Sequence, residues 1–344
     1  MTDAARPEGP GLEGANAAEA GHPLDPPLRR FIEANRAPLG AFAVLVVMMA
    51  IFVAASPEVF LEWNIYRSVL TTLPVALFLV VPLVFVVTAG EIDLSFPSTM
   101  GFSAWMFALM VQAGFSPYLG LAAAMATGAL LGYFVGALVV YFRLSSLIAT
   151  LGMNFMLRGV ILIVTQGKSI ALVSLSQSWV KSIFSGVAFG VPTQMFWALA
   201  FVVFASALFN RNQFGAHVKI VGDNPDSAQQ MGIDVNLVRV KAFVFVGLGA
   251  ALAGFFSTMI NVTWWPTSGD GYLLPGLASV FVGGTPTWGG IGTVVGGAIG
   301  ALIVSFIQTG IVGAGLSGFY VQFFNGLIII LSLIGHRWNQ IRYR

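Results

Sequence analysis

Long apolar runs, separated by short polar ones, dominate the chain from about residue 38 onward. An α-helix needs about 20 apolar residues to cross a bilayer, so these runs predict membrane-spanning helices. The longest runs hold two or three helices divided by glycine and proline. The pattern predicts an all-α integral membrane protein of about ten segments, some short or broken, over 38–57, 68–89, 97–113, 117–142, 147–166, 193–210, 241–262, 272–284, 289–313 and 317–335.

The remaining residues form polar regions. Residues 1–37 contain Pro, Gly, Ala and Glu with little apolar content, which is typical of a disordered tail. The membrane domain covers 38–336, and 337–344 form a second tail. Two longer connections interrupt the domain: an excursion over 168–192, with a short helix expected around Gln177–Ser185, and a polar loop over 210–240.

The cations fix the expected orientation, because Lys and Arg accumulate in short loops on the cytoplasmic side. Arginines precede the first span, follow the fourth and end the chain, and four cations flank the 210–240 loop: Arg211, Lys219, Arg239 and Lys241. An even number of spans places all of these on one side. We therefore expect both tails and the 210–240 loop to be cytoplasmic.

Composition supports this class and excludes others. Hydrophobic residues make up 57% of the chain and charged residues 9%, against about 25% charged in soluble proteins. With 16 Lys and Arg against 14 Asp and Glu, nothing indicates a nucleic-acid partner. The chain has no cysteine, its three histidines lack metal-ligand spacing, and no nucleophile or phosphate-loop motif is present. We expect no catalytic residue, metal or cofactor in this chain.

A short helix is predicted inside the 210–240 loop. Asp223 or Asn224 can cap it, Pro225 suits its first position, and Gly232 follows its end. A helix of about two turns is unstable alone. It must therefore pack against the loop itself or against the surface of a partner.

Two segments echo each other about 180 residues apart. Residues 90–97 follow one predicted span and open a short apolar segment, and residues 269–275 do the same in the opposite direction. Paired short segments of opposite direction, interrupted by glycine and proline, are typical of inverted-repeat transporters. The similarity of these two segments predicts an inverted repeat.

Charges at membrane depth are costly unless they pair or face water. Four stand out: Glu91, Asp93, Arg158 and Asp270. Each could line a pathway or hold a broken helix, and both readings stay open for Arg158. For Asp93 the structural reading is favoured, because its carboxylate can cap the helix that follows. We predict that Arg158 pairs with Glu91 or Asp270.

Several separated motifs stand out along the chain. They are 89–95 (Ala-Gly-Glu-Ile-Asp-Leu-Ser), 148–153 (Ile-Ala-Thr-Leu-Gly-Met) with Arg158-Gly159, 271–273 (Gly-Tyr-Leu), and 282–285 (Val-Gly-Gly-Thr) with Gly289-Gly290. Together these motifs resemble one known family, the permeases of bacterial ribose, xylose and arabinose importers, and the resemblance runs in order over about 40–335. Glu91 stands where that family commonly has glycine, and Phe96-Pro97 replaces a Val-Gly pair.

The resemblance implies a fold like that of type II ATP-binding-cassette importers. It also implies a bacterial inner-membrane complex of two permease copies, two cytoplasmic ATPase subunits that hold ATP and Mg²⁺, and a periplasmic solute-binding protein. The permease itself then catalyses no reaction. The short loop helix is similar to the family's coupling helix, with docking residues Asn224, Pro225, Ala228, Met231, Gly232 and Ile233.

A sugar or polyol needs amide, hydroxyl and aromatic groups more than fixed charges. Trp264 could serve this way, although it also sits where an interfacial aromatic belt is expected. The predicted pathway residues are Glu91, Asp93, Ser95, Asn154, Phe155, Arg158, Trp264, Asp270 and Tyr272.

Two alternatives remain open at this stage. A related permease for branched-chain amino acids or nucleosides would have similar topology. An ion-coupled secondary transporter would use membrane acids such as Glu91 or Asp270 as ion sites, but the coupling-type loop argues against it.

Overall fold

The computed structural model describes residues 35–176 and 178–342, and these are almost entirely helical. Seven helices are long and apolar enough to cross a membrane. The seven are α2 (Arg36–Ala55), α4 (Trp63–Thr88), α6 (Pro117–Val140), α7 (Ser146–Thr165), α10 (Thr193–Arg211), α13 (Val235–Asn261) and α15 (Val294–Gly313).

Three further predicted spans are helices that are shorter or less uniformly apolar: α5 (Phe96–Gln112), α14 (Leu273–Val282) and α16 (Phe319–Arg342). Together with the seven long helices they occupy the ten predicted segments. The all-α membrane class is confirmed, and the count of ten crossings stays a prediction. The 1–37 tail lies almost wholly outside the described residues, whereas α16 carries helix into the predicted 337–344 tail.

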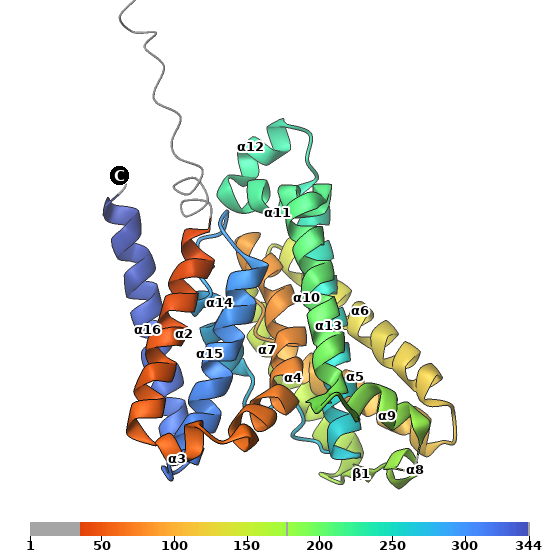
Figure 1. The fold of residues 1–344 in the computed structure, drawn as a ribbon. Helices are drawn as coiled ribbons and strands as arrows, with labels where there is room; N and C mark the ends of the chain where they lie inside the picture. Colours follow the sequence, from red (N-terminus) through yellow and green to blue (C-terminus); the bar gives the residue numbers. More distant parts are fainter. Residues whose placement is uncertain (1–34, 177, 343–344) are drawn as a thin grey trace, which may run out of the picture.

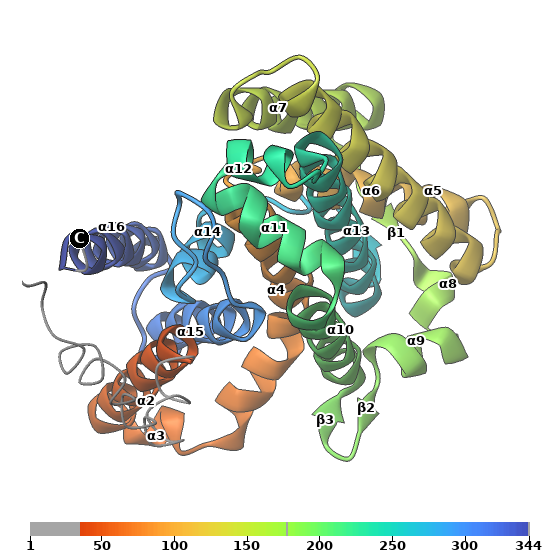
Figure 2. The same ribbon diagram turned by 90° about the horizontal axis from the view of Figure 1, so that it is seen from above.

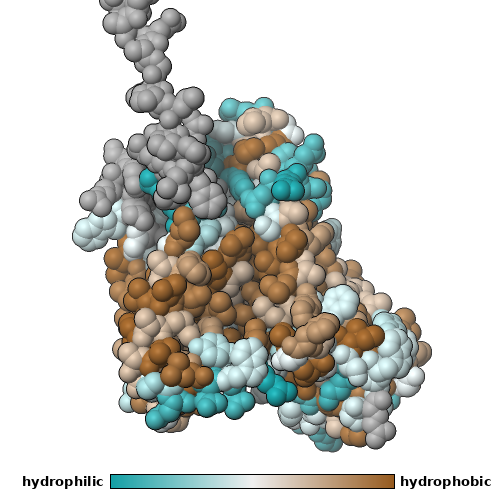
Figure 3. All heavy atoms as spheres, in the orientation of Figure 1, coloured by the Kyte–Doolittle hydropathy of each residue, from teal (hydrophilic) through white to brown (hydrophobic). Residues whose placement is uncertain are grey.

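A belt of hydrophobic residues crosses the middle of the visible face, with hydrophilic residues above and below it (Figure 3). Both ends of the described chain lie at the upper end of this view, where α11 (Gln213–Asp223) and α12 (Pro225–Gln230) project beyond the bundle (Figure 1). The connection between α7 and α10 lies at the opposite end. The two ends of the described chain and the 210–240 loop therefore share one side.

Helices α4 and α13 form the core of the bundle, and α10 and α15 pack on α4. Viewed from above, α5, α6 and α7 lie along one side and α2, α15 and α16 along the other (Figure 2). Helix α13 packs closely on α6, where Gly128 faces Gly247; a Cβ on either would overlap the other's carbonyl oxygen. Small residues here let two backbones approach without side chains between them.

The helix order long, short, long, long occurs twice, in α4–α7 and in α13–α16. Helix α4 runs toward the end that carries α11 and α12, and α13 runs away from it (Figure 1). These are the order and directions that the predicted inverted repeat requires. In each half a non-helical segment, 89–95 or 262–272, precedes the short helix.

The two long connections contain more structure than hydropathy predicts. The expected excursion helix appears as α9 (Trp179–Ser185), after α8 (Val173–Ser176). Strand β1 (Ile170–Ala171) pairs with β4 (Thr263–Trp264), and β2 (Val187–Ala188) pairs with β3 (Val191–Pro192). A one-turn helix, α3 (Pro57–Phe60), links α2 to α4.

Two helices begin at other residues than predicted for local reasons, and one helix was not predicted. Helix α13 begins at Val235 rather than 241, because the Asp234 carboxylate caps it by accepting from Leu237 N–H at 2.9 Å. Helix α15 begins at Val294 rather than 289, where the Thr293 hydroxyl caps it. Helix α11 was not predicted, because its polar face resembles a loop in a hydropathy profile.

Candidate functional site

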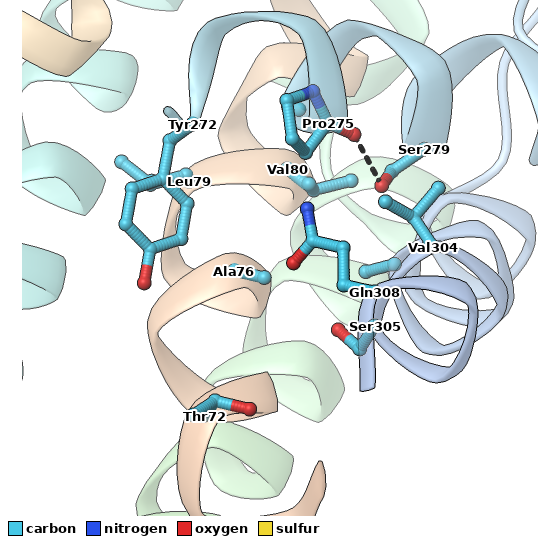
Figure 4. A pocket seen from close by; sticks show the side chains of 12 residues that line it. Thr72, Ala76, Leu79, Val80, Tyr272, Pro275, Ser279, Val304, Ser305 and Gln308 are labelled. Atoms are coloured by element: carbon cyan, nitrogen blue, oxygen red, sulfur yellow. Dashed lines mark hydrogen bonds between the residues drawn. The ribbon is translucent and has the colours of Figure 1, made fainter. Parts of the chain in front are cut away.

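A small cavity lies inside the bundle between α4, α14 and α15 (Figure 4). Its volume is about 30 Å³, enough for a water molecule but well below the roughly 300–1,000 Å³ common for small-molecule sites. Among the residues that the structure describes, no charged one lines it. Its polar side chains are two hydroxyls of serine, one of threonine, one of tyrosine and one amide: Ser279, Ser305, Thr72, Tyr272 and Gln308. We call this the inner cavity.

A larger and more open cavity, of about 670 Å³, lies next to it at the end of the bundle opposite α11 and α12. We call this the outer cavity. Glu58 and Glu62, at α3 and the start of α4, line its mouth together with Asn64 and Ser68. The two cavities share Thr72, Tyr272 and Gln308, so they are adjacent and these three side chains lie between them.

Of the predicted pathway residues, Tyr272 lines both cavities, and the others line neither. Sequence reasoning missed Thr72, Ser279, Ser305 and Gln308, because hydropathy does not show which neutral polar side chains on different spans face one another. A usable signal was present. Ser305 and Gln308 are three residues apart on an apolar span and so lie on one helix face.

Arg158 of α7 forms an ion pair with Asp270, which confirms that predicted partner. Its guanidinium also donates to the carbonyl oxygens of Pro266 and Ser268. The Arg158 side chain is 15% exposed and that of Asp270 is 57% exposed. Arg158 therefore fastens the 262–272 segment to α7 and does not line either cavity.

Glu91 is not the partner of Arg158. Its carboxylate lies 3.1 Å from the guanidinium of Arg239, near the start of α13. Of the two acids predicted as alternative partners of Arg158, the structure therefore selects Asp270, since the 89–95 segment lies near the α11 end of the bundle while 262–272 lies near the other end. Asp270 and Glu91, the two acids considered as ion sites for a secondary transporter, are thus both in ion pairs with arginines.

Asp93 and Ser95 hold the start of α5, as the structural reading expected. The buried Asp93 carboxylate accepts from the Ser95 backbone N–H at 2.7 Å and from its hydroxyl at 2.6 Å. From α7, the hydroxyl of Thr150 accepts from Leu94 N–H at 2.9 Å. These bonds satisfy backbone groups that a broken helix leaves without partners.

The remaining predicted pathway residues also have structural surroundings. Ser98 donates to the backbone carbonyl of Asn154 at 2.8 Å, which joins α5 to α7. Phe155 points outward from α7 and is 67% exposed. Trp264 is fully buried and donates to the Gly101 carbonyl oxygen at 3.0 Å. Their part in a pathway stays a prediction.

The predicted loop helix is present as α12, one residue shorter than expected. Asn224 caps it by accepting from Ser227 N–H at 3.0 Å, and Pro225 occupies its first position. Ala228 and Ile233 are buried against the chain itself, whereas Met231 is 68% exposed. Ala228 therefore packs this projection internally, and Met231 and Gly232 remain on its surface.

Helix α11 connects α12 to the bundle at a contact between glycines. We call α11 and α12 together the α11–α12 projection. A Cβ at Gly222 would overlap the Thr88 carbonyl oxygen, which also accepts from Gly290 N–H at 2.8 Å. Three segments thus meet backbone to backbone: the end of α11, the end of α4 and the loop before α15.

Lys219, also on α11, is partly buried, and this burial lowers the pKa of its ammonium. The ammonium lies 4.4 Å from the centroid of the Phe209 ring.

A membrane bundle that surrounds a polar cavity and carries a helical projection at one end defines a membrane transport protein. Residues 65–333 match the family described as the permease component of branched-chain amino acid transport systems. The match covers most of the chain, which therefore belongs to this family. It is a permease subunit and not an enzyme.

Curated relatives are similar over nearly their whole length. The ribose import permease RbsC of Escherichia coli K12 is 31% identical over 292 residues, which cover 84% of this chain and 90% of the relative. The autoinducer 2 import permease LsrC of an Enterobacter species is 31% identical, with 86% and 85% covered. The D-allose permease AlsC of E. coli K12 is 30% identical, with 86% and 88% covered. No solved structure gives a significant match.

Proposed function

We propose that the chain moves a neutral sugar or polyol across the bacterial inner membrane through the outer cavity and then through the inner cavity, which widens during transport to admit the solute. The observation that carries this proposal is the lining of the inner cavity, which offers hydroxyls, one amide and one tyrosine without a charged group. Such groups can exchange hydrogen bonds with a polyhydroxy solute. The import of ribose, D-allose and autoinducer 2 by its relatives agrees with this chemistry.

The same lining argues against the alternatives. A branched-chain amino acid carries an ammonium and a carboxylate, and desolvating them without opposite charges is costly. An ion-coupled transporter would need free membrane acids, but Glu91 and Asp270 are both paired with arginines.

The energy for transport comes from partner subunits in this proposal. Two cytoplasmic ATPase subunits hold ATP and Mg²⁺, and this chain binds no cofactor of its own. The α11–α12 projection is the docking surface, since Met231 at the end of α12 is 68% exposed and Leu237, in the first turn of α13 beside it, is 44% exposed. Through the glycine contact at Gly222, a displacement of α11 would move the ends of α4 and of the loop before α15.

Two further partners complete the complex. A periplasmic solute-binding protein delivers the solute at the end opposite the projection, where the outer cavity opens. A second copy of the permease lies beside this one in the bilayer, where it would cover the open side of the outer cavity. Both tails and the projection are then cytoplasmic.

The test is uptake by cells that express the permease with its ATPase and binding protein. We expect transport from a panel of labelled neutral monosaccharides and polyols, and no transport of labelled leucine. Uptake of leucine without any neutral sugar or polyol would overturn the proposal.

A charge introduced into the inner cavity tests the same point within one protein. Gln308→Glu keeps the side-chain size, and we expect it to lower uptake at least about tenfold, because an unpaired carboxylate there is costly. Gln166→Glu, at the exposed end of α7, is the matched control and should transport normally. Equal uptake by both variants would contradict an uncharged path.

A further inference from the structure

The inner and outer cavities meet at Thr72, Tyr272 and Gln308, which come from α4, the start of α14 and α15. No other residue lines both of these two cavities. Figure 4 shows the ring of Tyr272 at one side of the inner cavity and the Gln308 amide between it and Ser279. These three side chains therefore form the neck between the two spaces.

The polar groups of the neck are available to a ligand. Within residues 35–176 and 178–342, the hydroxyl of Tyr272 and the amide of Gln308 have no hydrogen-bond partner. Thr72 makes only long contacts to its own helix, at 3.3 and 3.4 Å. A polar group at membrane depth is costly unless it is satisfied, so these groups must face water or solute.

Of the three neck residues, Tyr272 is the one whose backbone position is fixed by the most interactions. It is the N-terminal cap position of α14, and two residues before it the Asp270 carboxylate is held by Arg158. Its backbone N–H bonds to Gly269 at 3.3 Å, and Gly276 N–H bonds back to Tyr272 at 2.8 Å. The ring is thus held between a fastened segment and a short helix, which fixes its place beside the cavity.

We propose that Tyr272, with Thr72 and Gln308, forms the constriction that separates the inner cavity from the outer one and selects a polyhydroxy solute. The tyrosine ring provides the barrier, and its hydroxyl and the Gln308 amide exchange hydrogen bonds with solute hydroxyls as these leave water. This inference rests on the proposed function, because it names the place in that path where the solute is chosen.

The natural chain has no cysteine, so single cysteines can report on the neck directly. Ser305→Cys places a thiol in the inner cavity, and Ser68→Cys places a matched thiol in the outer cavity. Each is made in the complete transporter in right-side-out vesicles and treated with a membrane-impermeant methanethiosulfonate. Labelling is read as the mass of the permease chain.

We expect the thiol at position 68 to react at least about tenfold faster than the thiol at position 305. Adding Tyr272→Ala should raise the rate at position 305 about tenfold and leave the rate at position 68 unchanged, because the barrier is removed only for the inner cavity. Equal rates at position 305 with and without Tyr272→Ala would overturn the barrier.

Tyr272→Phe separates shape from hydrogen bonding. It keeps the ring, so labelling at position 305 should stay slow, while loss of the hydroxyl should raise the KM for the transported solute several-fold with little change in maximal rate. An unchanged KM would overturn the selecting role. The labelling experiment needs no solute. If the neck is not a barrier, the labelling rates at position 305 will show it. If the solute is not a sugar or polyol, only the uptake measurements will show it.

Discussion

At the scale of single residues, three of the four charges singled out near membrane depth lie in ion pairs, and the fourth, Asp93, accepts hydrogen bonds from Ser95. Arg158 holds Asp270 on one side of the bundle, and Arg239 holds Glu91 near the other. Both pairs fasten a non-helical segment that precedes a short helix. Pairing lets each segment keep an ionised group where an isolated charge would be costly.

The first prediction concerns the unequal partners of the Arg158 pair. Asp270→Asn should lower uptake more than Arg158→Gln, because the arginine is the more buried of the two and would be left without its countercharge. The double variant should recover part of the loss caused by Asp270→Asn. The measurement is a double-mutant cycle on initial uptake rates, with expected non-additivity of about three- to tenfold.

Glu91→Gln is the matched control in this cycle. Glu91 belongs to the Arg239 pair, so its effect should add to that of Arg158→Gln without coupling. Strict additivity of Arg158→Gln with Asp270→Asn would contradict a functional role for the ion pair.

At the scale of elements, the α11–α12 projection shows how a helix that is short by itself becomes stable. Asn224 and Pro225 set the start of α12, as the sequence predicts. Ala228 and Ile233 then bury its inner side against the chain, while Met231 stays outside. The predicted docking residues therefore fall into an internal group and an outer group.

This division yields the second prediction. Met231→Glu should leave the permease folded but reduce ATPase co-purification and uptake about tenfold or more, because a charge would enter an apolar contact. Ala228→Glu should instead lower the amount of folded protein, because it buries a carboxylate inside the projection. Fluorescence-detected size exclusion and pull-down of the ATPase distinguish the two results.

Asn236→Asp serves as a surface control, since it adds a charge to an exposed position beside the same projection. It should behave like the unchanged protein in both assays. Normal ATPase binding and uptake by Met231→Glu would remove Met231 from the docking surface.

At the scale of the whole molecule, the hydrophobic belt lies between two polar ends of different kinds. The projection and both ends of the described chain share one end, and the outer cavity lies at the other. The distribution of Lys and Arg predicts that the first of these ends is cytoplasmic. A solute from outside would then reach the outer cavity first.

The third prediction tests this orientation. Alkaline phosphatase fused after Gly190, in the exposed β2–β3 turn, should be active, because that turn is expected in the periplasm. The same enzyme fused after Asn212, before α11, should be inactive, and green fluorescent protein fused after Arg344 should fluoresce. The reverse pattern of activities would invert the topology and the direction of import proposed here.

The sequence by itself determined the membrane class, the approximate spans and the caps of α12, because hydropathy and helix capping depend on neighbouring residues. Only the tertiary structure decided which side chains share a cavity. Thr72, Tyr272 and Gln308 come from three helices, and their meeting depends on how each helix is rotated and packed. Likewise, only packing showed that Glu91 belongs to Arg239 and that Ala228 faces inward.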